Sequence, residues 1–222
     1  VKVLIESNEN KTPDSDKNNG VGLLKVDFNG INFFNKEEAL EKISQDIEMK
    51  IENFKNKPVW CYAECNNDFD LLKMQFESIK KLEDKGLTNI GVAVAGATDA
   101  SQIKRAKEIL REIGIEPLEE LEFGIVVDNP AASILIKEMC ENEVDFVVIE
   151  LEKLTKLTLG ISQENDKKYD EFHPAVLKKI TNILKTCREM NIETSITGKN
   201  VTEPYFVEFL IKKGVDSIIC TA

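Results

Sequence analysis

The chain has 222 residues, of which 42% are hydrophobic, so it can bury one substantial core. Its 29 lysines and arginines against 40 aspartates and glutamates give a net charge of −11, which excludes nucleic acid and anionic membrane as expected partners. Because no apolar run approaches the roughly 20 residues that span a bilayer, and no signal-peptide pattern opens the sequence, we expect a cytoplasmic protein.

Short apolar segments alternate along the chain with amphipathic helical segments. The apolar segments predict strands at residues 2–6, 22–28, 58–64, 89–96, 122–128, 145–151, 193–198 and 216–222. Their near-continuous apolar character predicts a parallel sheet covered by helices. This number of strands in a chain of this length predicts an α/β fold, a closed (β/α)₈ TIM barrel forming a single domain over residues 1–222. No G-x-G-x-x-G follows a strand, which disfavours a dinucleotide-binding fold.

Capping residues and prolines mark the expected helix starts. Asn35 with Glu38, and Asp99 with Gln102, have the spacing of capping boxes. Apolar residues then recur at steps of three and four between positions 40 and 54, as on the buried face of a helix. First helical turns are also expected at Pro130, Pro174 and Pro204.

Two outer helices of the expected barrel are not evident in the sequence. Residues 7–20, "SNENKTPDSDKNNG", are turn formers without an apolar period, and the eighth strand ends the sequence. We therefore expect the first and last outer helices to be reduced or missing. Uncovered apolar positions on strands one and eight predict a partner surface, for a homodimer or another protein. The alternative is that the sequence is part of a longer chain whose next helix covers this gap.

Cysteine and histidine usage gives no sign of a metal centre or a catalytic triad. The five cysteines are scattered through apolar segments and are expected to be small buried hydrophobes. Cys61 and Cys65 have no second Cys or His pair at zinc-binding spacing. The single histidine makes a His-based triad improbable.

The stretch "LTKLTLGISQENDKKYDEFHPAVL" at 154–177 resembles the "LTQLTLG" and "YDE-HPAVL" signature of the phosphoenolpyruvate synthase and pyruvate phosphate dikinase family. Collinear similarities include "NNGVGLLKVDF", "GLTNIGVAVAGATDASQIKRAKEILREIGIEP" and "EFLIKKGVDSI". The resemblance covers nearly the whole chain. It implies the phosphoenolpyruvate/pyruvate-binding TIM barrel of that family, here degenerate and separate from the phosphohistidine and ATP-binding domains.

The same resemblance implies a mouth that has lost most of its phosphate contacts. In the family, arginines hold the phosphate, and their positions are occupied here by Lys25, Tyr62 and Thr98. With Lys199, these residues are our candidates for ligand binding. Thr197 stands at the position of the family's proton-donating cysteine, and a hydroxyl is a far weaker acid than a thiol, so we expect no catalytic residue.

The implied metal site is altered as well. Asp128 stands at one metal-binding carboxylate and Lys153 at the other, with Glu152 beside it. Asp128 and Glu152 could still hold Mg²⁺. The ammonium of Lys153 would compete for the same carboxylates, so we expect no cofactor unless Mg²⁺ binds at this pair.

We therefore expect a non-catalytic binding or regulatory barrel. The alternatives are a divalent-metal-dependent enzyme, in which Lys25 or Lys199 binds a small carboxylate, and a sensor that binds pyruvate or a related keto acid without turnover. The expected mouth has six carboxylates against three lysines, a poor receptor for a trianion: Asp27, Glu64, Asp99, Asp128, Glu150 and Glu152, with Lys25, Lys153 and Lys199.

Several of these residues also have structural interpretations. Asp128 could simply stabilise the N-terminus of the next helix, as Asp99 is expected to do. Residues 150–153 could be a solvated charged loop. His173, which precedes Pro174, is expected to be structural and to help order the loop that leads into the next helix.

Overall fold

A computed structural model describes residues 2–7, 21–25, 35–51, 54, 57–162 and 168–221. The strands pair in parallel in chain order, and β8 also pairs with β1, so the sheet is a closed barrel. The predicted α/β fold class and TIM-barrel architecture are confirmed. The strands are β1 (Lys2–Ser7), β2 (Val21–Leu24), β3 (Val59–Glu64), β4 (Ile90–Ala95), β5 (Glu122–Val127), β6 (Phe146–Glu150), β7 (Glu193–Thr197) and β8 (Ser217–Thr221).

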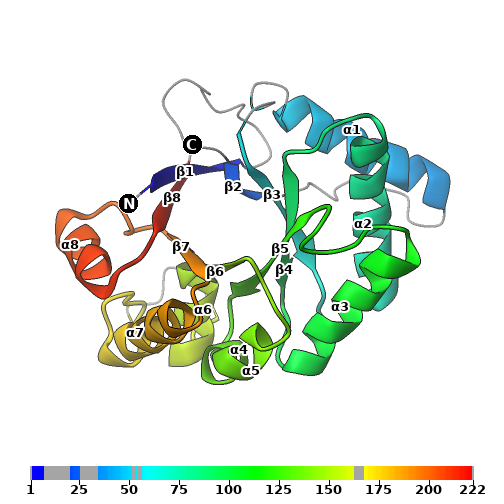
Figure 1. Ribbon diagram of the computed structural model, residues 1–222. Coiled ribbons are helices and arrows are strands. Elements are labelled where there is room, and N and C mark those ends of the chain that lie inside the picture. Colours follow the sequence, from blue (N-terminus) through cyan, green and yellow to red (C-terminus); the bar gives the residue numbers. More distant parts are fainter. Residues whose placement is uncertain are drawn as a thin grey trace.

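The helices of the described residues surround the barrel (Figure 1). Asn129 caps α4 and His173 caps α7, while α4, α7 and α8 each begin at a predicted proline. Asp99 and Gln102 form the expected capping box. The helices are α1 (Lys36–Ile51), α2 (Phe69–Asp84), α3 (Ala100–Glu112), α4 (Pro130–Ile134), α5 (Ile136–Cys140), α6 (Leu151–Leu159), α7 (Pro174–Glu189) and α8 (Pro204–Lys213).

The surroundings of β1 differ from those of the other strands in the described part of the chain. There, no helix lies between β1 and β2 or follows β8, and Figure 1 shows α8 and α1 on either side of these strands. Side chains alternate along β1, so Leu4 packs inside the barrel while Val3 points outward and remains 43% exposed. Residues 8–20, where a first outer helix was predicted to be reduced or missing, lie outside the described residues.

Two aspartates fix the starts of strands by the same contact. Asp145 precedes β6, and its backbone N–H and side-chain Oδ2 bond the C=O and N–H of Phe123, both at 2.8 Å. Asp216 precedes β8 and binds Thr194 in the same way, at 3.1 Å to its carbonyl and 2.8 Å from its N–H. Because each aspartate holds both polar groups of one residue, it sets the register of the adjoining strand.

The cysteines belong to the packing between sheet and helices. Cys61, Cys65, Cys140 and Cys187 are buried and Cys220 is half-buried, all as free thiols. Burial raises the pKa of the Cys61 thiol to about 12, so it stays protonated and unreactive at neutral pH. Within the described ranges, no helix combines the length and the apolar character needed to cross a membrane.

A stacked aromatic pair fills the interior of the barrel near the N-terminal ends of the strands. The rings of Trp60 and Phe146 lie 3.9 Å apart at 10° to each other. A Cβ on Gly124, in the neighbouring strand β5, would come within 2.3 Å of the Phe146 ring. Only a residue without a side chain fits there, because the aromatic pair already occupies the space.

Replacing Gly124→Ala should therefore destabilise the barrel by about 1–3 kcal/mol through overpacking. Phe146→Ala removes all the ring atoms that the new methyl group would meet, so the cost of Gly124→Ala should fall sharply in that background. Urea unfolding of the wild type, both single variants and the double variant measures this coupling. Equal costs in both backgrounds would contradict the packing argument.

Candidate functional site

The carboxyl ends of the strands bring charged side chains to one rim of the barrel, called here the mouth. Lys25 follows β2, Glu64 ends β3, Asp128 follows β5 and Glu150 ends β6. Loops at this end of a (β/α)₈ barrel carry its chemistry, whereas the opposite end contributes to stability. The mouth is therefore the place to look for a functional site.

Asp128 is a fixed and fully buried carboxylate, with 0% of its surface exposed. Its Oδ2 accepts hydrogen bonds from the Gly96 backbone N–H at 3.2 Å and from Lys153 Nζ at 2.7 Å. Its Oδ1 accepts from Asn129 Nδ2 at 2.9 Å. Gly96 has a φ of +72°, and a Cβ there would collide with Asn66, so glycine is needed at this donor.

Lys153 reaches Asp128 because α6 begins immediately after β6, which places Lys153 in the first turn of that helix. Its side chain is 37% exposed, against 0% for that of Asp128. Burial acts to lower the pKa of Lys153, but the hydrogen bond and charge of Asp128, with the charges of Glu150 and Glu64, raise it overall. The ammonium therefore stays protonated at neutral pH.

A second ion pair joins Lys25 to Glu150 across the mouth, with 3.1 Å between Nζ and Oε1. The same ammonium lies 5.4 Å from the centre of the Tyr62 ring. Lys50 of α1 donates to the Lys25 carbonyl at 3.1 Å, which holds the end of β2. Glu150 Oε2 is buried and, among the described residues, has no hydrogen-bond partner.

The pKa of the Tyr62 hydroxyl reflects the negative charge of the carboxylates at the mouth. Burial raises the pKa of its hydroxyl, and the charges of Glu150, Asp128 and Glu64 raise it further. The phenol therefore remains a neutral donor. Carboxylates from β3, from the end of β5 and from β6 thus act on one side chain within the barrel.

Other predicted site residues are placed as follows. Thr98 donates from its backbone N–H and from Oγ1 to Gln102 Oε1, at 2.6 and 3.1 Å, and so belongs to the capping structure of α3. Thr197 is buried at the end of β7, and Lys199 is exposed in the following loop. The assignment of Thr98 and Lys199 to ligand binding stays a prediction, as does the expectation that Thr197 has no catalytic role. Asp27 lies outside the described residues.

One of the structural interpretations was wrong and one stays a prediction. The N-cap of α4 is Asn129, which accepts from the Ala132 N–H, while Asp128 precedes it and accepts from the Asn129 amide, so stabilisation of this helix start by Asp128 stays a prediction. Residues 150–153 are not a solvated loop, because they form the end of β6 and the first turn of α6. Glu150 and Lys153 bind Lys25 and Asp128, so these two charges are part of the mouth.

The residues do not fit the magnesium site that the resemblance implies. The ammonium of Lys153 occupies the open side of Asp128. In the described part of the chain, no group of three or more His, Cys, Asp or Glu residues is arranged to hold a metal ion. Glu152 lies in the first turn of α6, beside Lys153. Whether it holds Mg²⁺ together with Asp128 is not tested by these contacts, so that pair stays a prediction.

The sequence signature before α7 serves as scaffold. Glu171 is 1% exposed, and its carboxylate accepts from the Tyr169 hydroxyl at 2.6 Å and from the Asn200 backbone N–H at 3.1 Å. The exposed His173 accepts from the Ala175 N–H as the N-cap of α7. The signature therefore ties the loop before α7 to the loop after β7. Sequence reasoning did not identify Glu171.

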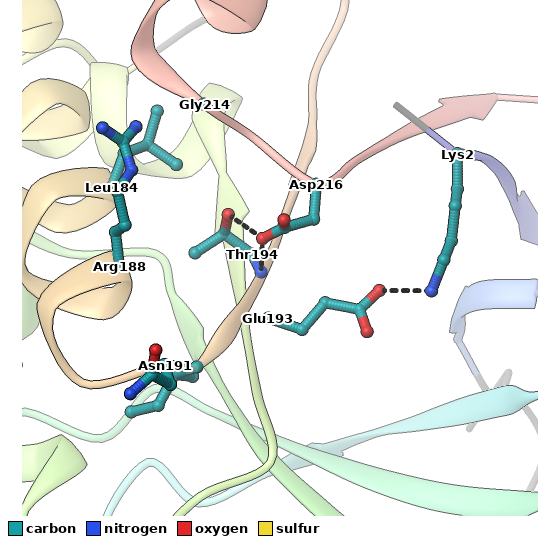
Figure 2. A pocket seen from close by; sticks show the side chains of 9 residues that line it. Lys2, Leu184, Arg188, Asn191, Glu193, Thr194, Gly214 and Asp216 are labelled. Carbon is teal, nitrogen blue, oxygen red and sulfur yellow. Dashed lines mark hydrogen bonds and ion pairs between the residues drawn. The ribbon is translucent and has the colours of Figure 1, made fainter.

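A hollow of about 650 Å³ lies at the other end of the strands, away from the mouth (Figure 2). Figure 2 shows the Asp216 carboxylate bonded to Thr194 and an ion pair between Lys2 and Glu193, 3.1 Å apart. Arg188 donates to the Lys213 carbonyl. These polar groups already bond one another and fix strand starts, so the hollow is assigned to stability and the mouth remains the candidate site.

Solved structures with similar folds are barrel proteins of low sequence identity. Malate synthase from Haloferax volcanii aligns with a TM-score of 0.62 at 12% identity, covering 89% of this chain and 60% of that one. Protein CitE from Mycobacterium tuberculosis, in complex with magnesium and pyruvate, aligns with a TM-score of 0.52 at 14% identity, covering 90% and 75%. At this identity the likeness establishes the fold alone.

Relatives found by sequence similarity have higher identity and indicate the family. The phosphoenolpyruvate synthase of Pyrococcus furiosus is 33% identical over 244 residues, covering 90% of this chain and 30% of that enzyme. The probable phosphoenolpyruvate synthase of Methanocaldococcus jannaschii is 37% identical over 155 residues, covering 68% and 13%. The first alignment is longer than this chain of 222 residues, so that relative has insertions which this barrel lacks.

The chain spans less than a third of the length of these enzymes. Residues 63–222 match the family model described as "PEP-utilising enzyme, PEP-binding domain", where PEP is phosphoenolpyruvate. This match includes the strands and loops that supply Glu64, Asp128, Glu150 and Lys153 to the mouth. The chain therefore belongs to the PEP-utilising enzymes and carries their PEP-binding domain.

Proposed function

We propose that this barrel is a phosphoenolpyruvate synthase-related protein without phosphotransfer activity, acting as a binding or regulatory module. The observation that carries the proposal is the state of the two lysines that form ion pairs at the mouth. Lys25 is bound to Glu150 and Lys153 to Asp128. A phosphate in a desolvated cleft needs several fixed cationic donors. Each of these donors is instead neutralised by a carboxylate of the chain.

An anionic ligand at this mouth would have to break an ion pair and approach further carboxylates. The charges of Glu64, Asp128 and Glu150 all act on Tyr62, which stands at the position of a phosphate-binding arginine in the resemblance. Like charges at this range disfavour binding by several kcal/mol, an order of magnitude set by the low dielectric of a buried site. The geometry therefore supports scaffold or regulatory duty over turnover of phosphoenolpyruvate.

A second candidate is a metal-dependent enzyme or sensor for pyruvate or a related keto acid. One observation favours it, which is the unpartnered and buried Glu150 Oε2 at the mouth. A fold neighbour, protein CitE, is described in complex with magnesium and pyruvate. Against this candidate, the Lys153 ammonium lies on the carboxylate that such a metal would need.

Calorimetry should detect no binding of phosphoenolpyruvate tighter than about 1 mM, with or without Mg²⁺. Glu150→Gln should raise the affinity by about tenfold, because it releases the charge of Lys25. The matched control is Glu193→Gln, which neutralises the partner of Lys2 at the opposite end and should change nothing. Tight binding by the wild type, or turnover by this chain alone, would contradict the proposal.

Thermal melting separates the second candidate from the first. If the barrel binds no divalent cation, excess Mg²⁺ or Mn²⁺ should leave the melting temperature of the wild type unchanged. A metal-dependent enzyme would instead be stabilised by the ion, and Asp128→Ala would abolish that stabilisation. A rise in Tm for the wild type that Asp128→Ala removes would favour the enzyme.

We also propose that a second copy of this chain covers the outer side of β1 and β8. Val3 points away from the interior and pairs in register with Ile218 of β8, beside the half-buried Cys220. Apolar side chains on the outside of a barrel strand are normally covered by a helix. A homodimer formed through these strands would bury this strip.

Light scattering should therefore give the mass of a dimer, and Val3→Asp should shift it to the mass of a monomer. Ile134 of α4 is 68% exposed, and α4 follows β5 on the far side of the barrel from β1 and β8, so Ile134→Asp is the matched control and should stay dimeric. Circular dichroism checks that both variants are folded. A monomeric wild type, or equal effects of the two substitutions, would rule out this surface.

A further inference from the structure

Asp128 is a completely buried carboxylate whose counter-charge comes from the chain itself. We infer that the Lys153 ammonium takes the place of a divalent cation at this mouth, so that the wild-type barrel is compensated without a metal and a cation site opens when the ammonium is removed. The inference concerns ions rather than organic ligands. It therefore goes beyond the proposed function and can fail while the phosphoenolpyruvate result stands.

The first support is the rigidity of the carboxylate. Asn129 Nδ2 donates to Asp128 Oδ1 and also to the Ala97 carbonyl, both at 2.9 Å, so the carboxylate is prevented from rotating. Oδ2 receives the Gly96 N–H on one side. The remaining approach to Oδ2 is filled by Lys153 Nζ at 2.7 Å, a normal length for a charge-assisted hydrogen bond.

The second support is the surplus of carboxylates at the mouth. Glu64 ends β3, Asp128 follows β5 and Glu150 ends β6, and Glu150 Oε2 is buried without a hydrogen-bond partner among the described residues. Carboxylate oxygens are the ligands that suit Mg²⁺ and Mn²⁺. Without the ammonium, these carboxylates would share a low-dielectric region in which Lys25 is bound to Glu150. A divalent cation is a compact way to restore the balance of charge there.

The third support is the free-energy cost of leaving the buried Asp128 carboxylate without a counter-charge. A buried carboxylate that loses its partner is strongly destabilising, because the charge has neither water nor a cation to stabilise it. Lys153 is tethered by α6 and reaches the carboxylate as part of folding. A tethered monovalent ammonium therefore performs the electrostatic part of a cation's role, but it offers no open coordination position to a substrate.

The test compares Mn²⁺ binding by the wild type and by Lys153→Ala, using calorimetry and thermal melting. We expect no detectable binding by the wild type and an affinity at least about tenfold higher in the variant. Melting of the variant should shift upward with Mn²⁺, and that of the wild type should not. Lys156→Ala removes the same charge one turn further along α6 and should behave as the wild type does.

A second variant keeps the test decisive if Lys153→Ala does not fold without an ion. Lys153→Ala combined with Asp128→Asn removes the uncompensated charge, so it should fold without Mn²⁺ and bind none. If Lys153→Ala alone does not fold without an ion, it should refold only when Mn²⁺ is added, as followed by circular dichroism. The inference is overturned if Lys153→Ala gains no Mn²⁺ affinity and no Mn²⁺-dependent refolding, or if the wild type binds Mn²⁺ equally well.

Discussion

The ion pair between Lys153 and Asp128 is the constraint around which the mouth is organised. A carboxylate with no exposed surface needs a permanent counter-charge, because burial of an unpaired ion costs several kcal/mol. Here the counter-charge is covalently part of the chain. Removing one partner of such a pair typically costs about 3–5 kcal/mol, and the 37% exposure of Lys153 puts this pair toward the lower end.

The second ion pair extends the same logic to the opposite side of the mouth. Lys25 Nζ is bound to Glu150 and lies over the Tyr62 ring, so the cation of β2 is neutralised by β6. Each pair joins groups far apart in the sequence and so connects different strands at the rim of the barrel. Both lysines that could attract an anionic ligand here are therefore in ion pairs with carboxylates of the chain itself.

The sequence predicts the barrel well because its signals are local. Strand boundaries follow runs of apolar residues, and the starts of α4, α7 and α8 follow proline, whose fixed φ suits a first helical turn. The capping box of Asp99 and Gln102 depends on residues three apart. The ion pairs could not be read this way, because they depend on where strands end relative to one another. Asp128 and Lys153 are 25 positions apart, and their contact requires α6 to begin at Leu151.

Several contacts that hold the barrel together lie apart from the charged groups of the mouth. Glu171 joins two loops through its buried carboxylate, and Asp145 and Asp216 hold the starts of strands at the opposite end. Trp60 and Phe146 fill the barrel interior near the N-terminal ends of the strands. None of these contacts involves Lys25, Asp128 or Lys153, so the strand starts and the loop before α7 are held by groups other than the charged residues of the mouth. This separation explains how a family signature such as "YDEFHPAVL" persists here: Glu171 and His173 order loops and a helix start, a role that does not require catalysis.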